Sequence, residues 1–360
     1  MSERVFVAMS GGVDSSVTAA ILADRGYDVV GVWMRLSKEG VANDAPRCCG
    51  TDEAGEEARR AAAHLGIPFY ALDYADVFGR DVVDRFVDAY AHGETPNPCV
   101  ACNAYVKFEA LLRDVVAKFG AAFLATGHYA RVVTDASGRH RLLRALDASK
   151  DQSYALYMLG QRELARVLFP IGELRAKEET RALAARYGLP NAAKAESMDI
   201  CFVPGDHRDL VRGRAPEAFV SGPVERSDGT VVGRHDGLAS LTVGQRRGVG
   251  VAAGERLYVL RLDLERNAAV VGTRAEVASR AYALRDVQFT FSEPPGQRFA
   301  STVALRYRAA PVACEVEALE RGSALIRLAE PALVAPGQAA VLYEGDEVLG
   351  GGTVREALAA

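Results

Sequence analysis

The sequence predicts an α/β fold with a doubly wound parallel sheet, followed by two β-rich modules. Apolar runs of strand length alternate with helical patterns over the first half of the chain, which is typical of a parallel sheet with helices on both faces. From about residue 204 the helical periodicity is lost, and short alternating runs between Gly and Pro indicate β-rich modules. We therefore expect three domains, at residues 1–204, 205–279 and 280–360.

The expected elements begin with a buried strand over residues 4–9 and a helix over residues 13–25, which Gly26 ends. Further strands of the same sheet are expected at residues 28–34, 67–72 and 123–126. Further helices are expected at residues 53–65, 77–90, 106–119, 154–168 and 177–187. A hairpin is expected over residues 131–145. The β-rich half has candidate strands at residues 254–262, 268–272, 300–307, 312–319, 324–328 and 339–343.

Length and composition are typical of a globular protein. The chain has 360 residues, of which 49% are hydrophobic and 25% charged, enough for two or three domains with cores of their own. No apolar run is long enough to span a membrane, and the N-terminus enters a strand without an apolar leader. We therefore expect a cytoplasmic protein with no membrane partner.

Charge and cysteine content narrow the classes of function. The net charge of −4 argues weakly against a nucleic-acid partner, yet no lysine follows Lys194, and the arginines used instead suit bidentate phosphate contacts. A GC-rich genome explains the same bias equally well. The six cysteines are too few and too scattered for a disulfide framework, so their spacing indicates chemistry or metal binding.

The stretch Ser-Gly-Gly-Val-Asp-Ser-Ser at residues 10–16 separates the first strand from the first helix and predicts a phosphate site. Its glycines let the backbone approach an anion, the N–H groups at the helix start point at it, and the hydroxyls of Ser10, Ser15 and Ser16 add donors. Asp14 would repel a phosphate unless a cation lay between them, so we expect it to hold Mg²⁺. An ordinary turn with a helix cap is the alternative interpretation.

A stiff loop with two thiols follows at residues 93–103. Pro96 and Pro98 keep the loop out of helix and sheet, and Cys99 and Cys102 form a Cys-x-x-Cys pair. Three interpretations of this pair are open: a redox pair, half of a metal site, or one nucleophile beside an incidental cysteine. Cys201 is a third notable thiol, which by itself fits a packed core as well as a reactive position.

Several ordered motifs extend over nearly the whole chain. They are the loop at residues 10–15 and the segments 95–98, 102–103, 125–129, 150–154, 199–202, 242–248, 306–308, 336–338 and 349–352. The first loop resembles that of the N-type ATP pyrophosphatases, which adenylate a carbonyl oxygen and release pyrophosphate. Together, the motifs resemble the tRNA-specific 2-thiouridylases, which put sulfur on the wobble uridine of certain tRNAs.

This resemblance implies a fold and assigns site residues by position. The fold is an adenine-nucleotide α hydrolase-like domain, a small central domain and a C-terminal β-barrel. Cys102 would be the nucleophile and Cys201 the persulfide carrier. ATP would be held by Ala8, Met9, Ser10, Gly11, Gly12, Val13, Asp14, Ser15, Met34 and Gly127. The tRNA would be contacted by Asn97, Pro98, Cys99, His128, Asp151, Gln152, Ser153, Arg306, Tyr307 and Gln338. Without the resemblance, His128 fits a structural role equally well, and residues 306–308 fit a solvated strand face.

The resemblance also implies the reaction and its partners. ATP would first adenylate the uridine 2-carbonyl, because its oxygen is a poor leaving group, and sulfur would then displace AMP. The expected partners are a tRNA with a wobble uridine and a protein that donates sulfur. Two alternatives are an ammonia-using synthetase of the same ATP pyrophosphatase class and a zinc-stapled RNA-binding protein, with Cys99 and Cys102 as half a zinc site.

The chain departs from the family pattern at Cys99, where many members carry aspartate. The thiolates of Cys99, Cys102 and Cys201 could hold three irons of a four-iron four-sulfur cluster and leave the fourth iron to carry sulfide. We therefore hypothesise an oxygen-labile cluster, with a Cys201 persulfide resolved by Cys102 as the second route. Zinc would need a fourth ligand, for which Cys48 and Cys49 are candidates.

Overall fold

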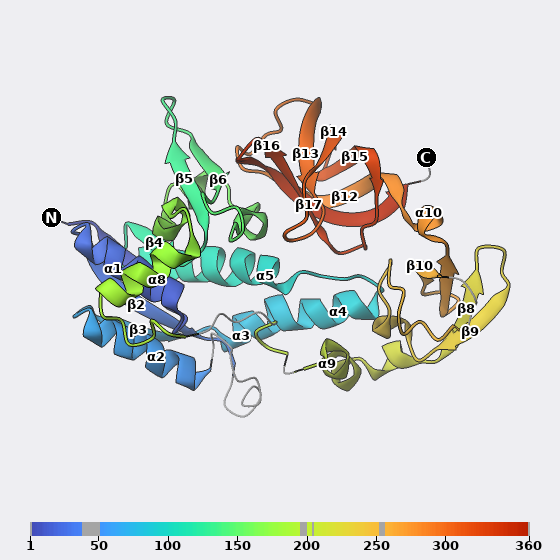
Figure 1. Cartoon of the computed structure of the whole chain (residues 1–360), viewed down its shortest axis with the longest axis horizontal. Helices are drawn as coiled ribbons and strands as arrows, with labels where there is room; N and C mark the ends of the chain where they lie inside the picture. Colours follow the sequence, from blue (N-terminus) through green and yellow to red (C-terminus); the bar gives the residue numbers. More distant parts are fainter. Residues whose placement is uncertain (1, 38–50, 195–199, 204, 252–255, 359–360) are drawn as a thin grey trace.

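A computed structural model describes residues 2–37, 51–194, 200–203, 205–251 and 256–358. The chain forms three parts: a parallel sheet with helices, a C-terminal barrel above, and a small β-rich part at the far end (Figure 1). Helices α4 (Arg85–Ala91) and α5 (Pro98–Ala101) lie between the parallel sheet and the two β-rich parts. The predicted fold class is confirmed.

The parallel sheet has the strand order β3-β2-β1-β4-β7. Its strands are β1 (Arg4–Ala8), β2 (Asp28–Arg35), β3 (Phe69–Asp73), β4 (Phe123–Thr126) and β7 (Val167–Leu168). Successive residues of a strand point to opposite faces. Val5 and Val7 therefore pack with helices α1 (Val13–Asp24) and α2 (Asp52–His64), whereas Phe6 packs in the core on the other face.

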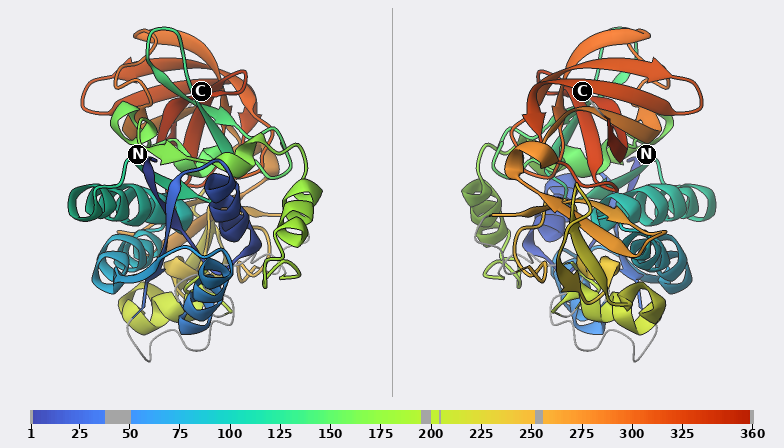
Figure 2. Two further views of the ribbon diagram at one scale, coloured as in Figure 1. Left: turned by 90° about the vertical axis from the view of Figure 1, so that its left-hand side faces the viewer. Right: turned by 90° about the vertical axis from the view of Figure 1, so that its right-hand side faces the viewer.

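Two long helical stretches cover that other face (Figure 2). The first is α3 (Ala75–Phe78), the π-helix η1 (Gly79–Asp84) and α4, and the second is α5, the π-helix η2 (Cys102–Leu111) and α6 (Leu112–Phe119). The second stretch begins at Pro98 rather than at residue 106 as predicted. Proline suits the first helical position, and the Asn97 side chain caps the stretch by accepting the Cys99 N–H at 3.1 Å.

The predicted helix over residues 154–168 is wrong. The segment holds the 3-10 turn η3 (Ser153–Leu156), the short helix α7 (Gln161–Leu164) and then β7, which pairs in parallel with β4. Gly160 is extended where the helix would have continued, with φ −92° and ψ −177°. Pairing at the edge of the sheet therefore prevails over the helical pattern. The next predicted helix is confirmed as α8 (Lys177–Arg186).

The C-terminal strands close into a barrel, because β12 pairs with both β15 and β17. The barrel strands are β12 (Ser279–Phe289), β13 (Arg298–Ala304), β14 (Val312–Leu319), β15 (Ser323–Ala332), β16 (Ala339–Glu344) and β17 (Glu347–Leu358). Neither β12 nor β17 was predicted. Where β17 crosses β12, a Cβ at Gly350 would lie 2.1 Å from the Gln288 carbonyl oxygen, so close backbone approach requires glycine there.

The central part has a sheet in the order β10-β11-β8-β9. Its strands are β8 (Gly222–Arg226), β9 (Val231–His235), β10 (Tyr258–Asp263) and β11 (Ala268–Gly272). The first two were not predicted. Helices α9 (His207–Arg214) and α10 (Arg274–Val277) flank the sheet in sequence. The predicted boundary at Pro204 and the start of the strand predicted at 254–262 lie outside the described residues.

The predicted hairpin is confirmed as β5 (Ala130–Thr134) and β6 (His140–Arg144), but it belongs to a sheet that the sequence did not indicate. Leu143 pairs with Glu347 of β17, and the Arg144 N–H donates to the Asp346 carbonyl at 2.8 Å. The N-terminal part is thereby joined to the barrel by strand pairing (Figure 2). In the described part of the chain, no helix has the length and apolar character needed to cross a bilayer.

Candidate active site

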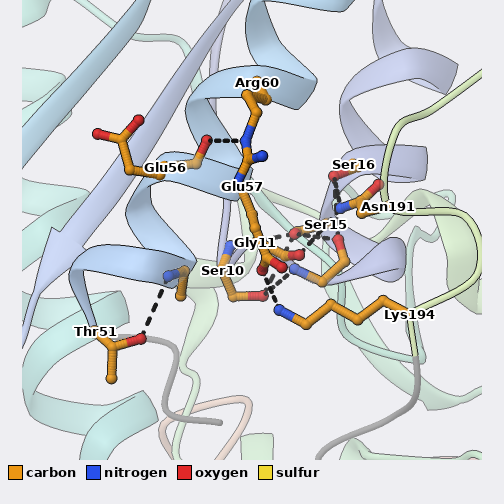
Figure 3. A network of polar contacts seen from close by, with 12 residues as sticks. Ser10, Gly11, Ser15, Ser16, Thr51, Glu56, Glu57, Arg60, Asn191 and Lys194 are labelled. Atoms are coloured by element: carbon orange, nitrogen blue, oxygen red, sulfur yellow. Dashed lines mark hydrogen bonds and ion pairs between the residues drawn. The ribbon is translucent and has the colours of Figure 1, made fainter. Parts of the chain in front are cut away.

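The loop after β1 is a tight turn whose hydroxyl groups bond to its own backbone (Figure 3). Ser15 Oγ accepts the Ser10 N–H at 3.2 Å and lies 3.1 Å from the Gly12 carbonyl oxygen, to which it donates. Gly11 has φ +74°, and a Cβ there would lie 2.5 Å from the Ala54 carbonyl oxygen. Only glycine therefore permits both the turn and its contact with α2.

A segment after α8 holds the same loop from outside, and the sequence did not predict it. Asn191 is buried, and its Nδ2 donates at 3.0 Å to both the Gly11 carbonyl and Ser16 Oγ. The Lys194 ammonium forms an ion pair with Glu57 of α2 beside the loop (Figure 3). The loop is thus held between α2 and the segment that follows α8.

Asp14 lies in a network of buried polar groups. Its Oδ1 accepts hydrogen bonds from Lys177 Nζ at 2.5 Å and from the Tyr129 hydroxyl at 3.1 Å. Lys177 is only 8% exposed, whereas the Asp14 side chain is 31% exposed. Burial, followed by the charge of Asp14, raises the pKa of Tyr129 to about 12, so its phenol remains a donor at neutral pH. The sequence predicted Mg²⁺ at Asp14, which stays a prediction, and it did not predict the ion pair with Lys177.

Of the other residues predicted to hold ATP, one lies against the start of α1, and the rest pack in the core or at its margin. Gly127 lies against the start of α1, because a Cβ on it would be 2.8 Å from Ser15 N. Ala8 and Met34, at the carboxyl ends of β1 and β2, pack at the margin of the core. Met9 is buried and its N–H donates to the Val32 carbonyl at 2.8 Å, so it supports the loop from within the core. Val13 is buried at the start of α1.

The structure brings two of the three predicted thiols into one apolar cluster. Cys102 is buried at the start of η2, and Cys201 packs against the same cluster although it is distant in sequence. Phe202 anchors the Cys201 segment, with ring centroids 5.6 Å from Phe78 and 5.3 Å from Phe86. Cys99 is exposed one helical turn before Cys102. Ala8 and Met34 pack on this cluster too, so it reaches the carboxyl ends of β1 and β2, where the nucleotide is predicted to bind.

Metal ligands are not assembled in the described ranges. There, no group of three or more His, Cys, Asp or Glu side chains is arranged to hold a metal ion. The hypothesised cluster on Cys99, Cys102 and Cys201 is therefore not shown by the described residues. The zinc candidates Cys48 and Cys49 lie outside the described residues, as does the whole segment 195–199 that precedes Ile200 and Cys201.

Three of the residues expected to contact tRNA make internal hydrogen bonds. Asp151 accepts the N–H groups of Ala145 at 3.0 Å and Ser153 at 3.2 Å, and Ser153 is fully buried. Gln152 Oε1 accepts the Tyr129 N–H at 3.0 Å and so orients the residue that donates to Asp14. In this conformation these residues position others, and their contact with tRNA stays a prediction.

His128 is also enclosed. Its ring lies between Phe108 and Phe169, at centroid distances of 6.0 and 5.9 Å, and Nδ1 is 2.6 Å from Thr126 Oγ1. Burial, reinforced by the charge of Lys107, lowers the pKa of His128 well below its usual value. His128 is therefore neutral at physiological pH.

The remaining predicted tRNA contacts differ in exposure. Arg306 and Tyr307 lie on an exposed turn after β13, with Tyr307 39% exposed and the Arg308 guanidinium 5.1 Å from its ring. Gln338, by contrast, donates from Nε2 to the Thr95 carbonyl at 2.6 Å, across the interface between the barrel and the N-terminal part. Asn97 and Pro98 begin α5, beside the thiols.

Comparison with known proteins covers all three parts of the chain. Residues 3–205 match the tRNA methyl transferase HUP domain, residues 208–273 the tRNA methyl transferase PRC-barrel domain, and residues 279–354 the aminomethyltransferase beta-barrel domain. A tRNA-specific 2-thiouridylase MnmA of Chloroflexus aggregans is 48% identical over 353 residues, which are 98% of each chain. That of Moorella thermoacetica is 47% identical, covering 97% of this chain and 98% of its own.

Similarity to solved structures is weaker. A predicted subunit of a tRNA methyltransferase from Methanocaldococcus jannaschii matches 60% of this chain and 87% of its own, at 19% identity and a TM-score of 0.31. That score is too low to support a conclusion. The identity of 47–48% to the curated relatives extends over nearly the full length of the chain. This chain therefore belongs to the tRNA-specific 2-thiouridylase family.

Proposed function

We propose that this protein is a tRNA-uridine 2-sulfurtransferase that uses ATP to exchange the 2-oxygen of a wobble uridine for sulfur. The observation that carries the proposal is that Cys102 lies in one apolar cluster and Cys201 packs against the same cluster, as do Ala8 and Met34. Ala8 ends β1 just before the phosphate loop and packs against this cluster, which supports a site at the carboxyl edge of the parallel sheet, where doubly wound folds bind ligands. Membership of the 2-thiouridylase family supports the same activity.

The residues around the first loop fit an ATP phosphate chain. The glycine turn and the start of α1 offer backbone N–H groups, and Lys177 adds a buried positive charge next to them. We infer that Asp14 would hold Mg²⁺. With Mg²⁺ at Asp14, the Lys177 ammonium would neutralise negative charge on the phosphates. Bound Mg²⁺ would stabilise the negative charge of the departing pyrophosphate.

Sulfur transfer requires two thiols with different roles. A donor protein would leave a sulfane sulfur on Cys201, and the terminal sulfur of this persulfide would attack C2 of the adenylated uridine, from which AMP leaves with the bonding electron pair. Cys102 thiolate would then attack Cys201 Sγ, which forms a Cys102–Cys201 disulfide and releases the 2-thiouridine. The two thiols supply the two electrons that reduce the sulfane sulfur, and an external dithiol restores them.

This persulfide route replaces the cluster as the favoured hypothesis. The cluster would need Cys99 as a third thiolate close to the other two, and the described residues show no such ligand group. Cys99, exposed at the start of α5, would instead lie next to the target base together with Asn97 and Pro98.

The decisive experiment is mass analysis of tRNA nucleosides from cells that lack this protein. We expect 2-thiouridine to disappear and to return with the wild-type gene but not with the Cys102→Ser variant. Unchanged 2-thiouridine would contradict the proposal. A purified protein with stoichiometric zinc and no ATP turnover would favour an RNA-binding role instead.

A second measurement tests the class of ATP chemistry. The wild type with tRNA should release pyrophosphate and AMP, because adenylation splits ATP between its α and β phosphates. Release of orthophosphate would contradict membership of the ATP-pyrophosphatase class, whether the acceptor is tRNA or the small substrate of an ammonia-using synthetase.

A further inference from the structure

The three parts of the chain meet at the short segment before α5, residues 93–97. Gly93 has φ +72°, and a Cβ there would lie 3.3 Å from a side-chain carbon of Leu262 in the central part. The Glu94 N–H donates to the Ala89 carbonyl at 2.8 Å, which ties the segment to the end of α4. The segment is therefore fixed from the N-terminal side and touches a second part of the chain.

The barrel holds this segment through an ion pair with two hydrogen bonds. Arg285 of β12 donates from Nη1 to Glu94 Oε1 at 2.6 Å and from Nη2 to Glu94 Oε2 at 2.7 Å. Two parallel bonds fix orientation as well as distance, which a lysine cannot do. This contact joins residues that are 191 positions apart in the sequence.

The next residue, Thr95, has contacts with both β-rich parts. Its N–H donates to the Pro336 carbonyl at 2.7 Å, and its carbonyl accepts from Gln338 Nε2 at 2.6 Å. Gly337 between them has φ +87°, and a Cβ on it would lie 2.8 Å from Thr95 N, so only glycine fits. The Thr95 hydroxyl lies 3.3 Å from the hydroxyl of Thr242 in the central part.

Only Pro96 and Asn97 separate these contacts from α5, which carries Cys99 and leads directly into Cys102. A proline transmits position along a chain better than most residues because its φ is fixed. The phosphate loop, in contrast, is held by Asn191, which has no share in the junction. The thiols and the nucleotide are therefore positioned by separate contacts.

We propose that Glu94 and Arg285 are positioning residues for sulfur transfer, through which the barrel sets the start of the thiol-bearing helix independently of the ATP site. The inference rests on the proposed function and adds a role for the interface between the domains. Binding of tRNA to the barrel would affect the position of Cys102 through this ion pair. Loss of the contact should therefore uncouple thiolation from adenylation.

The test measures pyrophosphate and 2-thiouridine in the same reaction, with full-length protein, persulfide donor and tRNA. For Arg285→Ala we expect pyrophosphate release near the wild-type rate and 2-thiouridine formed per pyrophosphate lower by about 10- to 100-fold, the usual effect of a misplaced reacting group. Arg285→Lys, which keeps the charge but not the paired bonds, should lie between. Gly337→Ala disturbs the same junction from another residue and should also lower the ratio.

Arg298→Ala is the matched control, because the exposed Arg298 of β13 pairs with Glu317 of the neighbouring strand β14 at 2.8 Å and lies outside the junction. It should leave the ratio unchanged. Arg285→Ala with an unchanged ratio, or with both products reduced in parallel, would overturn the inference. A wild type that releases no pyrophosphate would contradict the proposed function instead, so the two failures are distinguishable.

Discussion

Replacing Lys177 should weaken ATP binding while leaving the fold intact. The ammonium of this buried lysine lies 2.5 Å from Asp14 Oδ1, next to the turn that we propose holds phosphate. Methionine has a similar length and suits an apolar environment, so Lys177→Met removes the charge and little of the packing. Asp14 keeps its hydrogen bond from Tyr129 and is 31% exposed to water.

The expected loss of ATP affinity follows from the proposed hydrogen bond between the Lys177 ammonium and a phosphate oxygen, which the substitution would remove. A hydrogen bond to a charged group contributes about 1.5–3 kcal/mol, which corresponds to about a 10- to 100-fold weaker affinity for ATP. The fold should lose less than the roughly 3–5 kcal/mol that follows the removal of one partner from a fully buried ion pair, because water reaches Asp14.

Calorimetric titration with a non-hydrolysable ATP analogue and Mg²⁺ measures this affinity directly. Lys118→Met is the matched control, since Lys118 forms an ion pair with Asp114 on the surface of α6 at 3.1 Å. The affinity of this variant for the ATP analogue should equal that of the wild type. If Lys177→Met bound the analogue as tightly as the wild type, Lys177 would be a structural residue and our account of the phosphate site would be refuted.

Four further predictions concern single side chains. Cys102→Ser and Cys201→Ser should still release pyrophosphate but make no 2-thiouridine, and near-normal thiolation by either would contradict its assigned role. Cys99→Ser should keep its thiolation activity after iron is removed. If wild-type activity instead depended on iron, shown by iron assay and Mössbauer spectroscopy, the iron–sulfur cluster would again be the favoured hypothesis. Burial lowers the pKa of His128 in the folded protein, so the unfolded chain binds more protons than the folded one below about pH 6.5. The free energy of unfolding should therefore fall as the pH drops through that range. Urea titrations should show a shallower fall for His128→Asn. Burial raises the pKa of Cys314 to about 12, so iodoacetamide should label it far more slowly at pH 8 than the exposed Cys99, as peptide mass mapping would show.

Local patterns were sufficient for the elements whose stability is local. The alternation of apolar runs and helices predicted the parallel sheet, and the glycine turn at residues 10–16 predicted a turn between its first strand and first helix. The hairpin at β5 and β6 was also predicted, because its turn chemistry is contained in its own residues. In the hairpin and the glycine turn, the signal and the structure occupy the same short stretch of chain, whereas the sheet follows from strands and helices that alternate over residues 4–168.

Elements that depend on distant partners were predicted poorly. The segment over residues 154–168 has the apolar spacing of a helix, but its last residues pair with β4 at the edge of the sheet. Strand β17 contains Gly350–Gly352, which conceals its alternation, and it exists because β12 and β16 pair with it on either side. Neither outcome can be inferred from a local pattern.

The same division holds for the site. The residue types in the first loop and the spacing of Cys99 and Cys102 predict phosphate and thiol chemistry from the sequence alone. The partner of Asp14 is Lys177, 163 positions away, and the partner of Thr95 is Gln338, 243 positions away. Such contacts form only when the completed core brings their elements together, because no local pattern records which distant side chain will arrive. Residue types along the chain therefore predict the chemistry that we propose, whereas the contacts that hold those residues in place depend on the packing of distant elements.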